Sequence, residues 1–220
     1  MLTFKTLMKS ETKRGFITNC RNRVIFGKTF PQHGGSIIVD PSKIEKYTSV
    51  FHRNFSCCIK AGNWDILNNS IYESYKYKAL KNRFVHNMSW EETGIYNKIL
   101  CNISESKFQI SDGCRNISDI KKRYRGIDKM YSELKRDNYL KPHSVYSNSS
   151  SELLGILVHF GRNGNLIFGN GGNHRFYISK ILNIKKIPCL IGVIHKGYSK
   201  EFHYRYMDNI NIGRLDFHYE

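Results

Sequence analysis

The stretch LIFGNGGNHRFYISKILNIKKIPCLIGVIH, residues 166–195, carries the clearest structural signal in the chain. A short apolar run meets a pair of glycines, and from His174 onward apolar residues recur at three- and four-residue spacings, as on one face of a helix. Asn183 is placed to end that helix, Pro188 prevents its resumption, and a second apolar run follows. The pattern predicts a strand, a glycine-rich turn, a helix and a final strand.

Another apolar run lies just upstream, at SELLGILVHF (151–160), and the segment GRNGN (161–165) connects it to Leu166. Asn-Gly at the centre of a short connection is typical of a β-hairpin. We therefore predict an α+β fold in which residues 146–220 form a small mixed sheet with helices. Residues 1–145 are predicted to form a mainly helical region packed on this module, with the boundary in the polar segment YSNSSSE.

Three helices are predicted in the middle of the chain, because apolar residues recur there at helical spacing. Their expected ranges are 63–84, 88–103 and 118–138. Ser89 with Glu92 three residues later forms a capping box in the second of them. The first 60 residues are predicted to be irregular with short strands. Within them, residues 36–47 indicate a brief strand and then a turn or short helix opened by Pro41.

The bulk composition indicates a globular protein. The chain has 220 residues and 40% apolar content, which suffices for one sizeable core or two small domains. It shows neither an apolar run long enough to span a membrane nor a secretory signal, so we expect a cytoplasmic protein with no membrane partner. The six cysteines lack C-x-x-C spacing and are expected to be reduced thiols, mostly buried, rather than metal ligands.

The charge balance is strongly basic. Thirty-five Lys and Arg residues against 18 Asp and Glu residues give a formal net charge of +17. Such a surplus favours polyanionic partners, such as nucleic acid, an acidic membrane face or phosphorylated small molecules. The basic residues are spread along the chain rather than massed in one tail, so a generally basic surface is the alternative interpretation.

The glycine turn is a candidate phosphate site. A helix that begins after glycines presents backbone N–H groups without intrahelical partners, and the helix dipole adds partial positive charge there. Arg175 adds a full positive charge, and glycines let an anion approach the backbone closely. The alternative is a tight strand-to-helix turn in which His174 and Arg175 pack or pair locally.

The Gly-Gly-Asn-His-Arg element at 171–175, its helix and the IKKIPCLIGVIH strand resemble the ParB/sulfiredoxin superfamily, in which a related box cradles nucleotide phosphates. The resemblance covers about residues 153–195, in the order hairpin, G-G-x-H-R, helix, Ile-Pro and strand. A looser likeness at AGNWD (61–65), RFVHNMSWEET (83–93) and GIDKMYSELKRDNYLK (126–141) points to a ParB-like family of microbes and their viruses. It implies that the whole chain is one functional unit.

Two departures limit what the resemblance implies. Sulfiredoxins carry a cysteine in this box, and Asn173 takes its position here, so sulfinic acid repair has no nucleophile. ParB partition proteins continue into a helix-turn-helix domain, and the 25 residues after His195 contain no two-helix pattern. Superfamily members that phosphorylate a small hydroxyl compound need only the phosphate cradle and a carboxylate, so the resemblance implies a kinase of this kind.

Such a kinase implies ATP or CTP with Mg²⁺ as cofactors, and a nucleotide and a small-molecule acceptor as partners. The resemblance and the hairpin turn together give the expected cofactor-binding residues, which are Gly171, Gly172, Asn173, His174, Arg175, Arg162 and Asn163. No ligand set for a resident metal follows from the sequence.

The catalytic candidates are carboxylates, because transfer to a hydroxyl needs a general base. Asp65 follows Trp64 in a short glycine-containing segment, where loops often carry function. Glu92 has a competing role in the capping box, which leaves Glu91 free to point elsewhere. Asp128 stands among basic residues of a predicted helix and is expected to form an ion pair instead.

The alternative function is a nucleic-acid-binding or regulatory ParB-like protein, with a nuclease as a further enzymatic option. Its support is the net charge of +17 and the basic tail from Tyr198, where aromatic residues alternate with Lys200 and Arg205 as base stacking requires. The residues leave the acceptor, the preferred nucleotide and the oligomeric state open.

Overall fold

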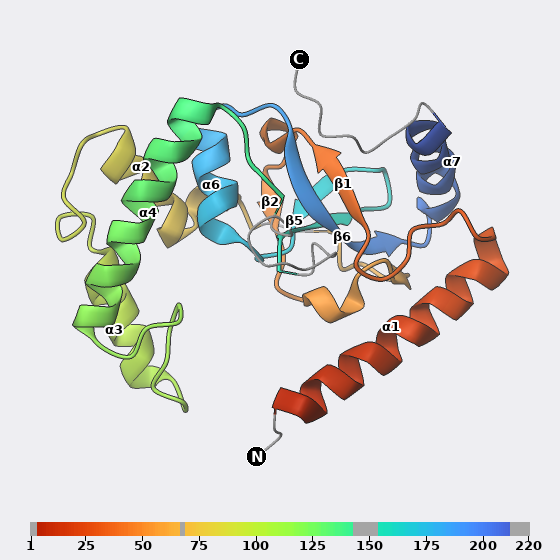
Figure 1. Ribbon diagram of the computed structural model, residues 1–220, viewed down its shortest axis with the longest axis horizontal. Helices are drawn as coiled ribbons and strands as arrows, with labels where there is room; N and C mark the ends of the chain where they lie inside the picture. Colours follow the sequence, from red (N-terminus) through yellow and green to blue (C-terminus); the bar gives the residue numbers. More distant parts are fainter. Residues whose placement is uncertain (1–3, 67–68, 143–153, 212–220) are drawn as a thin grey trace.

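The protein is a mixed α+β fold, as predicted (Figure 1). The computed structural model describes residues 4–66, 69–142 and 154–211. The helices are α1 (Phe4–Phe26), α2 (Tyr75–Phe84), α3 (Ile95–Glu105), α4 (Ile117–Asp137), α6 (Asn173–Ile181) and α7 (Ser199–Asn211). Short 3-10 turns are η1 (Pro41–Lys43), η2 (Arg53–Phe55) and η3 (Ile71–Glu73). The strands are β1 (Ser36–Val39), β2 (Lys46–Tyr47), β3 (Ile59–Lys60), β4 (Ile156–Phe160), β5 (Leu166–Phe168) and β6 (Ile187–His195).

The sheet is built around β6, its longest strand. The strand order is β1-β6-β4-β5-β2, and β3 pairs with β6 beyond this path. β4 and β6 are parallel and β4 and β5 form the predicted antiparallel hairpin, so the sheet is mixed. Eight of the nine residues of β6 are buried, which explains why its sequence is a continuous apolar run rather than an alternating one.

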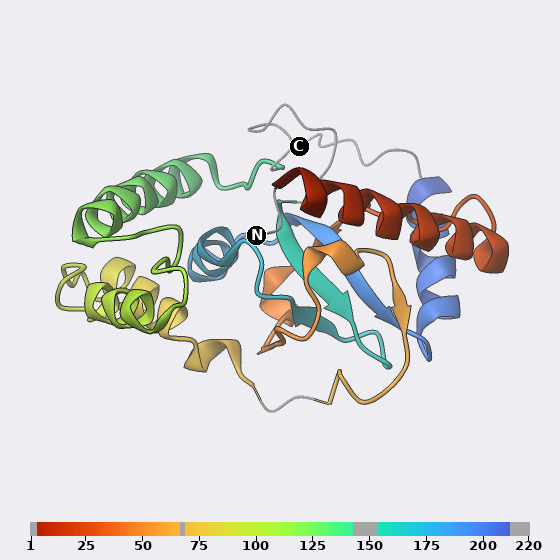
Figure 2. The same cartoon turned by 90° about the horizontal axis from the view of Figure 1, so that it is seen from below.

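Helices flank the sheet on two sides. Helices α2, α3, α4 and α6 gather on one side, while α7 and much of α1 lie toward the other (Figures 1 and 2). A large apolar cluster joins the first group to the sheet through residues such as Ile156, Phe168 and Phe176. A smaller cluster, including Phe160 and Phe202, joins α7 to the far end of the sheet. Each end of the sheet is therefore fixed by its own core.

The pairing of β4 with β6 contains an irregularity at His159. Val158 lies opposite Ile191 and Phe160 opposite Ile194, so β6 contains one more residue than β4 over this interval. The backbone N–H of Val193 donates to His159 Nδ1 at 2.8 Å. The imidazole thus satisfies a backbone donor that the bulge would otherwise leave unpaired in a buried position.

Helix α1 was not predicted from the sequence, and the expectation of irregular structure there was wrong. Over residues 13–26, where its side chains are described, the buried positions carry small or polar residues, namely Gly15, Thr18 and Asn22. Phe16 and Val24 are 70% and 87% exposed. An apolar stripe facing the core is the usual sign of a helix, and α1 has the reverse arrangement. The short strand and turn predicted after it are confirmed as β1 and η1.

The three predicted central helices are present with corrected starting points. The helix expected over 63–84 occupies only Tyr75–Phe84, after the turn η3. The capping-box contacts of Ser89 and Glu92 form, but α3 begins later, after Gly94, whose φ of 73° suits a left-handed helix cap. The helix expected over 118–138 is confirmed as α4, capped by Asn116.

The predicted domain boundary near residue 145 divides the sequence between strands that belong to the same sheet. Strands β1, β2 and β3 precede it, and β4, β5 and β6 follow it. The predicted start of the hairpin strand at Ser151 lies outside the described residues, and β4 begins at Ile156. Helix α6 follows the glycines as predicted, and Asn183 adopts a φ of 56° just beyond its end.

Replacing Gly192 by alanine tests whether the bulge depends on close packing against His159. A Cβ at this position would lie 2.2 Å from His159 Nδ1 and 2.9 Å from the backbone oxygen of Val158. We expect Gly192→Ala to lower the free energy of unfolding by about 1–3 kcal/mol, because overpacking forces the strand or the ring to move. Urea titration followed by far-UV circular dichroism measures this.

The matched control for this substitution is Gly126→Ala in α4. No atom lies within 4 Å of a Cβ at Gly126, so the same change should stabilise the protein by about 0.5–1 kcal/mol through helix propensity. Equal effects of the two substitutions would contradict the assigned role of Gly192.

Candidate functional site

The glycine turn folds back onto the start of β4. Gly172 has a φ of 72° and is the N-cap of α6, a conformation that favours glycine. A Cβ on Gly172 would lie 3.0 Å from the Cα of Ile156, and the backbone N–H of Leu157 donates to the carbonyl of Gly171 at 3.3 Å. Both glycines are therefore required by close approach of the turn to the strand.

The N-terminus of α6 carries positive charge from several sources. Gly172 has no side chain to cap the helix, so the first-turn N–H groups of α6 lack a side-chain acceptor at the cap position. Arg53, the first residue of η2, places Nη2 3.3 Å from the position of a Cβ on Gly171. Arg175 Nη2 donates to the carbonyl of Leu154 at 3.2 Å. Two guanidinium groups from separate segments thus lie beside the turn.

Asn173 and His174 differ in where their side chains lie. Asn173 Nδ2 donates to the carbonyl of Asn170 at 3.3 Å and so braces the turn. His174 is 8% exposed, and its Nε2 lies 3.6 Å from Asp112 Oδ2. Its ring also contacts Tyr124 at a centroid distance of 5.8 Å. Burial lowers the pKa of His174 to about 4 against the opposing effect of Asp112, so the imidazole is neutral at pH 7.

Asp112 anchors this side of α6 and was not identified from the sequence. Its carboxylate pairs with Lys76 at 2.7 Å and with Arg123 at 3.2 Å. Burial raises the pKa of Asp112, but its neighbours His174, Lys76 and Arg123 together hold it below the usual range. In the sequence, Asp112 is marked only by the Asp-Gly pair of a turn, and none of the residues that contact its carboxylate is close to it in sequence.

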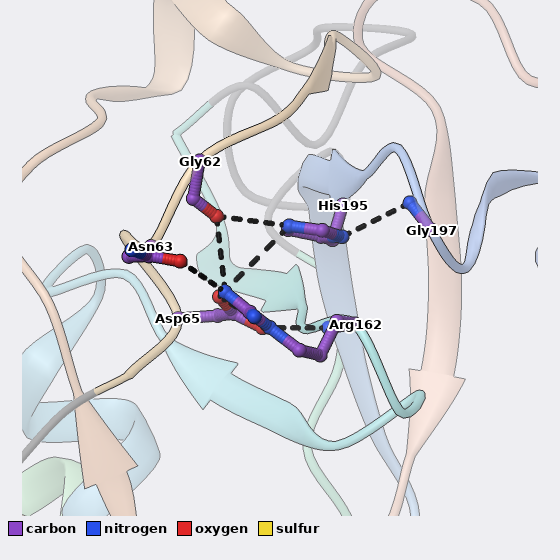
Figure 3. A network of polar contacts seen from close by, with 6 residues as sticks. All are labelled: Gly62, Asn63, Asp65, Arg162, His195 and Gly197. Carbon is purple, nitrogen blue, oxygen red and sulfur yellow. Dashed lines mark hydrogen bonds and ion pairs between the residues drawn. The ribbon is translucent and has the colours of Figure 1, made fainter.

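Asp65 forms a second polar cluster with Arg162 and His195 (Figure 3). Arg162 Nη2 lies 2.7 Å from Asp65 Oδ1, and the backbone N–H of Arg162 donates to Oδ2 at 2.8 Å. His195 Nε2 lies 4.0 Å from the same carboxylate and 3.0 Å from the carbonyl of Gly62. The hydrogen bonds from Arg162 lower the pKa of Asp65 to about 2, although its burial opposes this. Asn163, next in the hairpin turn, is exposed.

Apart from the two glutamates, the predicted site residues fall into two groups at opposite ends of β4. The glycine turn packs against Ile156 and Leu157, whereas Arg162 follows the other end, after Phe160. At about 3.3 Å per residue, the strand separates the two ends by roughly 17 Å. The structure therefore brings Asp65, Arg162 and His195 together but does not place them beside Gly171 and Gly172.

The predicted glutamates lie beyond His174 in the helical region. Glu92 Oε2 accepts from the N–H and the hydroxyl of Ser89, at 2.6 and 2.7 Å, and these bonds lower its pKa. Glu91 is exposed and lies 3.5 Å from Lys121. Between them and α6, the ring of Trp90 contacts Tyr124, which in turn contacts His174.

Asp128 forms the ion pair expected of it, although its partner is on another helix. Arg83 Nε of α2 donates to Asp128 Oδ1 at 3.0 Å, and Trp90 Nε1 donates to Oδ2 at the same distance. This carboxylate therefore ties α2 to α4 and to the turn before α3.

The C-terminal segment has a structural role that its sequence did not indicate. Tyr198 and Phe202 are 6% and 3% exposed and pack in the smaller core cluster. Two of the aromatic residues proposed to stack on bases are therefore buried. Lys200 and Arg205 are exposed on α7. Residues 212–220 of the predicted basic tail lie outside the described part of the chain.

Comparison of the chain with protein-family models, with curated proteins and with solved structures finds no match in any of the three. Among the described residues, no helix has the length and apolar character needed to cross a membrane. Within the same ranges, no three His, Cys, Asp or Glu side chains are grouped so as to hold a metal ion. All six cysteines are free thiols, and three of them are buried.

Replacing Asp65 by asparagine tests the Asp65–Arg162 cluster through its pH dependence. The folded-state pKa of about 2 is below the unfolded value of about 4, so the stabilisation is present above pH 4 and is lost as the pH falls toward 2. We expect Asp65→Asn to lower the free energy of unfolding by about 2 kcal/mol at pH 7, and by much less near pH 2.5. Urea titrations across this range provide the measurement.

Asp137→Asn serves as the control, because this partly exposed carboxylate also pairs with an arginine, the exposed Arg136, at 2.7 Å. Its removal should leave stability nearly unchanged at either pH. If Asp65→Asn lowers the free energy of unfolding equally at pH 7 and pH 2.5, the negative charge of Asp65 does not stabilise the hairpin turn.

Proposed function

We propose that the protein is a nucleotide-dependent phosphotransferase that binds ATP or CTP, with Mg²⁺, at the glycine turn of a ParB/sulfiredoxin-like fold. The observation that carries the proposal is the convergence of an uncapped helix N-terminus, two close-packed glycines and the guanidinium groups of Arg53 and Arg175. Backbone N–H groups and guanidinium groups are the donors that bind phosphate oxygens.

Mg²⁺ in this proposal arrives with the nucleotide. Magnesium usually retains several waters and is held by substrate phosphates with one or two carboxylates, so it needs no dedicated protein cage. When bound, the ion would neutralise charge on the phosphates.

The acceptor is a small hydroxyl compound, and its proton must leave during transfer. The bond between the transferred phosphorus and the bridging oxygen breaks, the acceptor oxygen bonds to phosphorus, and a carboxylate takes the hydroxyl proton. Asp65 suits this role poorly, because it is engaged by Arg162 and its pKa is about 2. Glu92 is engaged by Ser89. Glu91 is exposed and only loosely paired, so we propose it as the base for an acceptor that reaches from the glycine turn past Tyr124 to the turn before α3.

Titration calorimetry with ATP, CTP and GTP in the presence of Mg²⁺ tests the binding step. One of these nucleotides should bind in a one-to-one ratio, and transfer to candidate hydroxyl compounds can then be followed with that nucleotide. Failure of all three to bind would overturn the proposal.

Replacing Arg175 by alanine tests whether the turn binds phosphate. We expect Arg175→Ala to weaken nucleotide binding about ten- to a hundredfold, because a charge-assisted hydrogen bond contributes about 1.5–3 kcal/mol. Arg175→Lys should restore part of the affinity, since an ammonium keeps the charge but loses the planar fork. Calorimetry and thermal melting on the same samples separate binding from folding.

The charge-matched control is Arg125→Ala, which removes an exposed arginine of α4. It should leave nucleotide affinity unchanged. A folded Arg175→Ala protein with normal affinity would remove the glycine turn as the phosphate site.

Replacing Glu91 by glutamine tests the assigned base. General-base catalysis contributes typically about 10²- to 10⁴-fold, so Glu91→Gln should reduce kcat by a factor in that range with little change in nucleotide affinity. Steady-state kinetics and calorimetry provide the two measurements. The neighbouring Glu92→Gln is the control, because glutamine still accepts a hydrogen bond from Ser89. Equal losses from both substitutions would point to the turn's structure rather than to Glu91.

A further inference from the structure

A basic groove runs between α1 and the segment that contains η2 and β3. It encloses about 430 Å³ and lies at the polar face of α1. Its cations are Lys13, Arg14 and Arg21 from α1 and Lys60 from β3, and none of the residues that line it is acidic. Both views place η2, drawn in orange, alongside α1 (Figures 1 and 2).

The reversed character of α1 creates this groove. A helix packed through large apolar side chains would fill the space against η2, but the buried positions of α1 carry Thr18 and Asn22. Arg14, Thr18 and Arg21 follow the three- and four-residue spacing of one helix face. At 1.5 Å rise per residue, Arg14 and Arg21 lie about 10.5 Å apart along the axis. The positive charge is thus spread along the groove rather than focused at one point.

The four cations of the groove have no carboxylate partner among the described residues. None of Lys13, Arg14, Arg21 and Lys60 forms an ion pair with a carboxylate of the described residues. Instead, Arg14 and Lys60 lie over the ring of Phe55, at 4.6 and 5.5 Å from its centroid. Arginine and aromatic planes are the surfaces on which unstacked nucleic-acid bases pack.

Asn22 provides a separate indication of a ligand. It is 2% exposed and lines the groove. Its Nδ2 donates to the carbonyl of Cys57 at 2.9 Å, whereas its Oδ1 has no hydrogen-bond partner in the described structure. A buried acceptor without a partner costs about 1–3 kcal/mol. A ligand that carries an amino or hydroxyl donor would satisfy it.

We propose that this groove binds single-stranded nucleic acid, with Lys13, Arg14, Arg21 and Lys60 on successive phosphates and Phe55 and Arg14 against a base. The spread of charge favours a polyanion over a single phosphate group. The groove is too small for a duplex, whose bases are in any case not available for stacking. A lipid surface presents phosphates without bases or base-edge donors. The groove is lined by residues other than those of the glycine turn, and the inference does not rest on nucleotide binding there.

Fluorescence anisotropy with labelled 12-nucleotide oligo-dT and oligo-U, between 50 and 200 mM salt, tests the proposal. Release of counterions from four phosphates predicts a slope of log affinity against log salt of about −2.8, or −0.7 for each phosphate. Arg14→Ala combined with Arg21→Ala should bring the slope to about −1.4 and weaken binding about tenfold or more at the lowest salt. Circular dichroism confirms that the variant is folded.

The control is Lys98→Ala combined with Arg125→Ala, which removes two exposed positive charges from α3 and α4. This protein should keep the slope of the unmodified chain. Arg175→Ala should also keep it, even where nucleotide binding is lost, so the two sites fail or succeed separately.

Three results would overturn the proposal. The first is an equal change of slope in the groove variant and its control, which would indicate general attraction by the net charge. The second is displacement of the oligonucleotide by ATP or CTP at concentrations that saturate the glycine turn, which would make the groove part of one nucleotide site. The third is groove-dependent binding of phosphatidylserine vesicles in the absence of oligonucleotide binding.

Discussion

The hydrogen bond from the N–H of Val193 to His159 Nδ1 fixes the register of the two central strands, and both candidate sites depend on that register. The bond requires a neutral imidazole with Nδ1 unprotonated, and burial supplies this condition by lowering the pKa of His159 to about 4. Because β4 is held in one register, the glycine turn is held against the first residues of β4. For the same reason, the turn that contains Arg162 is held just beyond the last residue of β4. A shift of one residue would turn every side chain of β4 to the other face of the sheet.

The distribution of carboxylates explains why a strongly basic chain has a basic groove rather than a uniform surface. The most buried acidic groups each take up cations from a different element: Asp65 engages Arg162, and Asp112 engages Lys76 and Arg123. These pairs hold the hairpin turn and the helical side of α6. With 18 acidic residues against 35 basic ones, at least 17 cations cannot be matched one to one by a carboxylate. The α1 groove is one place where the surplus gathers without a carboxylate partner among the described residues, and cations in a concavity attract anions.

Local patterns in the sequence were sufficient for the strand–turn–helix–strand segment and the hairpin. There, glycines, the Asn-Gly turn and the change from apolar runs to helical spacing all agree. Helix α1 was missed because periodicity methods assume that apolar residues face the core, and Thr18 and Asn22 occupy those positions. The helix expected from residue 63 was too long because mixed spacings through a turn imitate a helix face. Local patterns could not predict the polar clusters either, since Asp65 meets a partner 97 residues away and His174 of α6 meets Asp112 of the turn before α4.

The turn η2 connects the two proposed anion sites, and its anchoring decides whether they communicate. Arg53 begins η2 beside Gly171, and Phe55 ends it in the groove. The following residues are tied to β6, where Ser56 Oγ donates to the carbonyl of Ile191 at 2.6 Å and the N–H of Cys57 to that of Gly192 at 2.8 Å. Coupling between two sites requires an element with two arrangements whose balance both ligands shift. In this structure η2 is followed directly by residues fixed to a buried central strand, which opposes a second arrangement. The geometry therefore supports two independent sites on a shared rigid support.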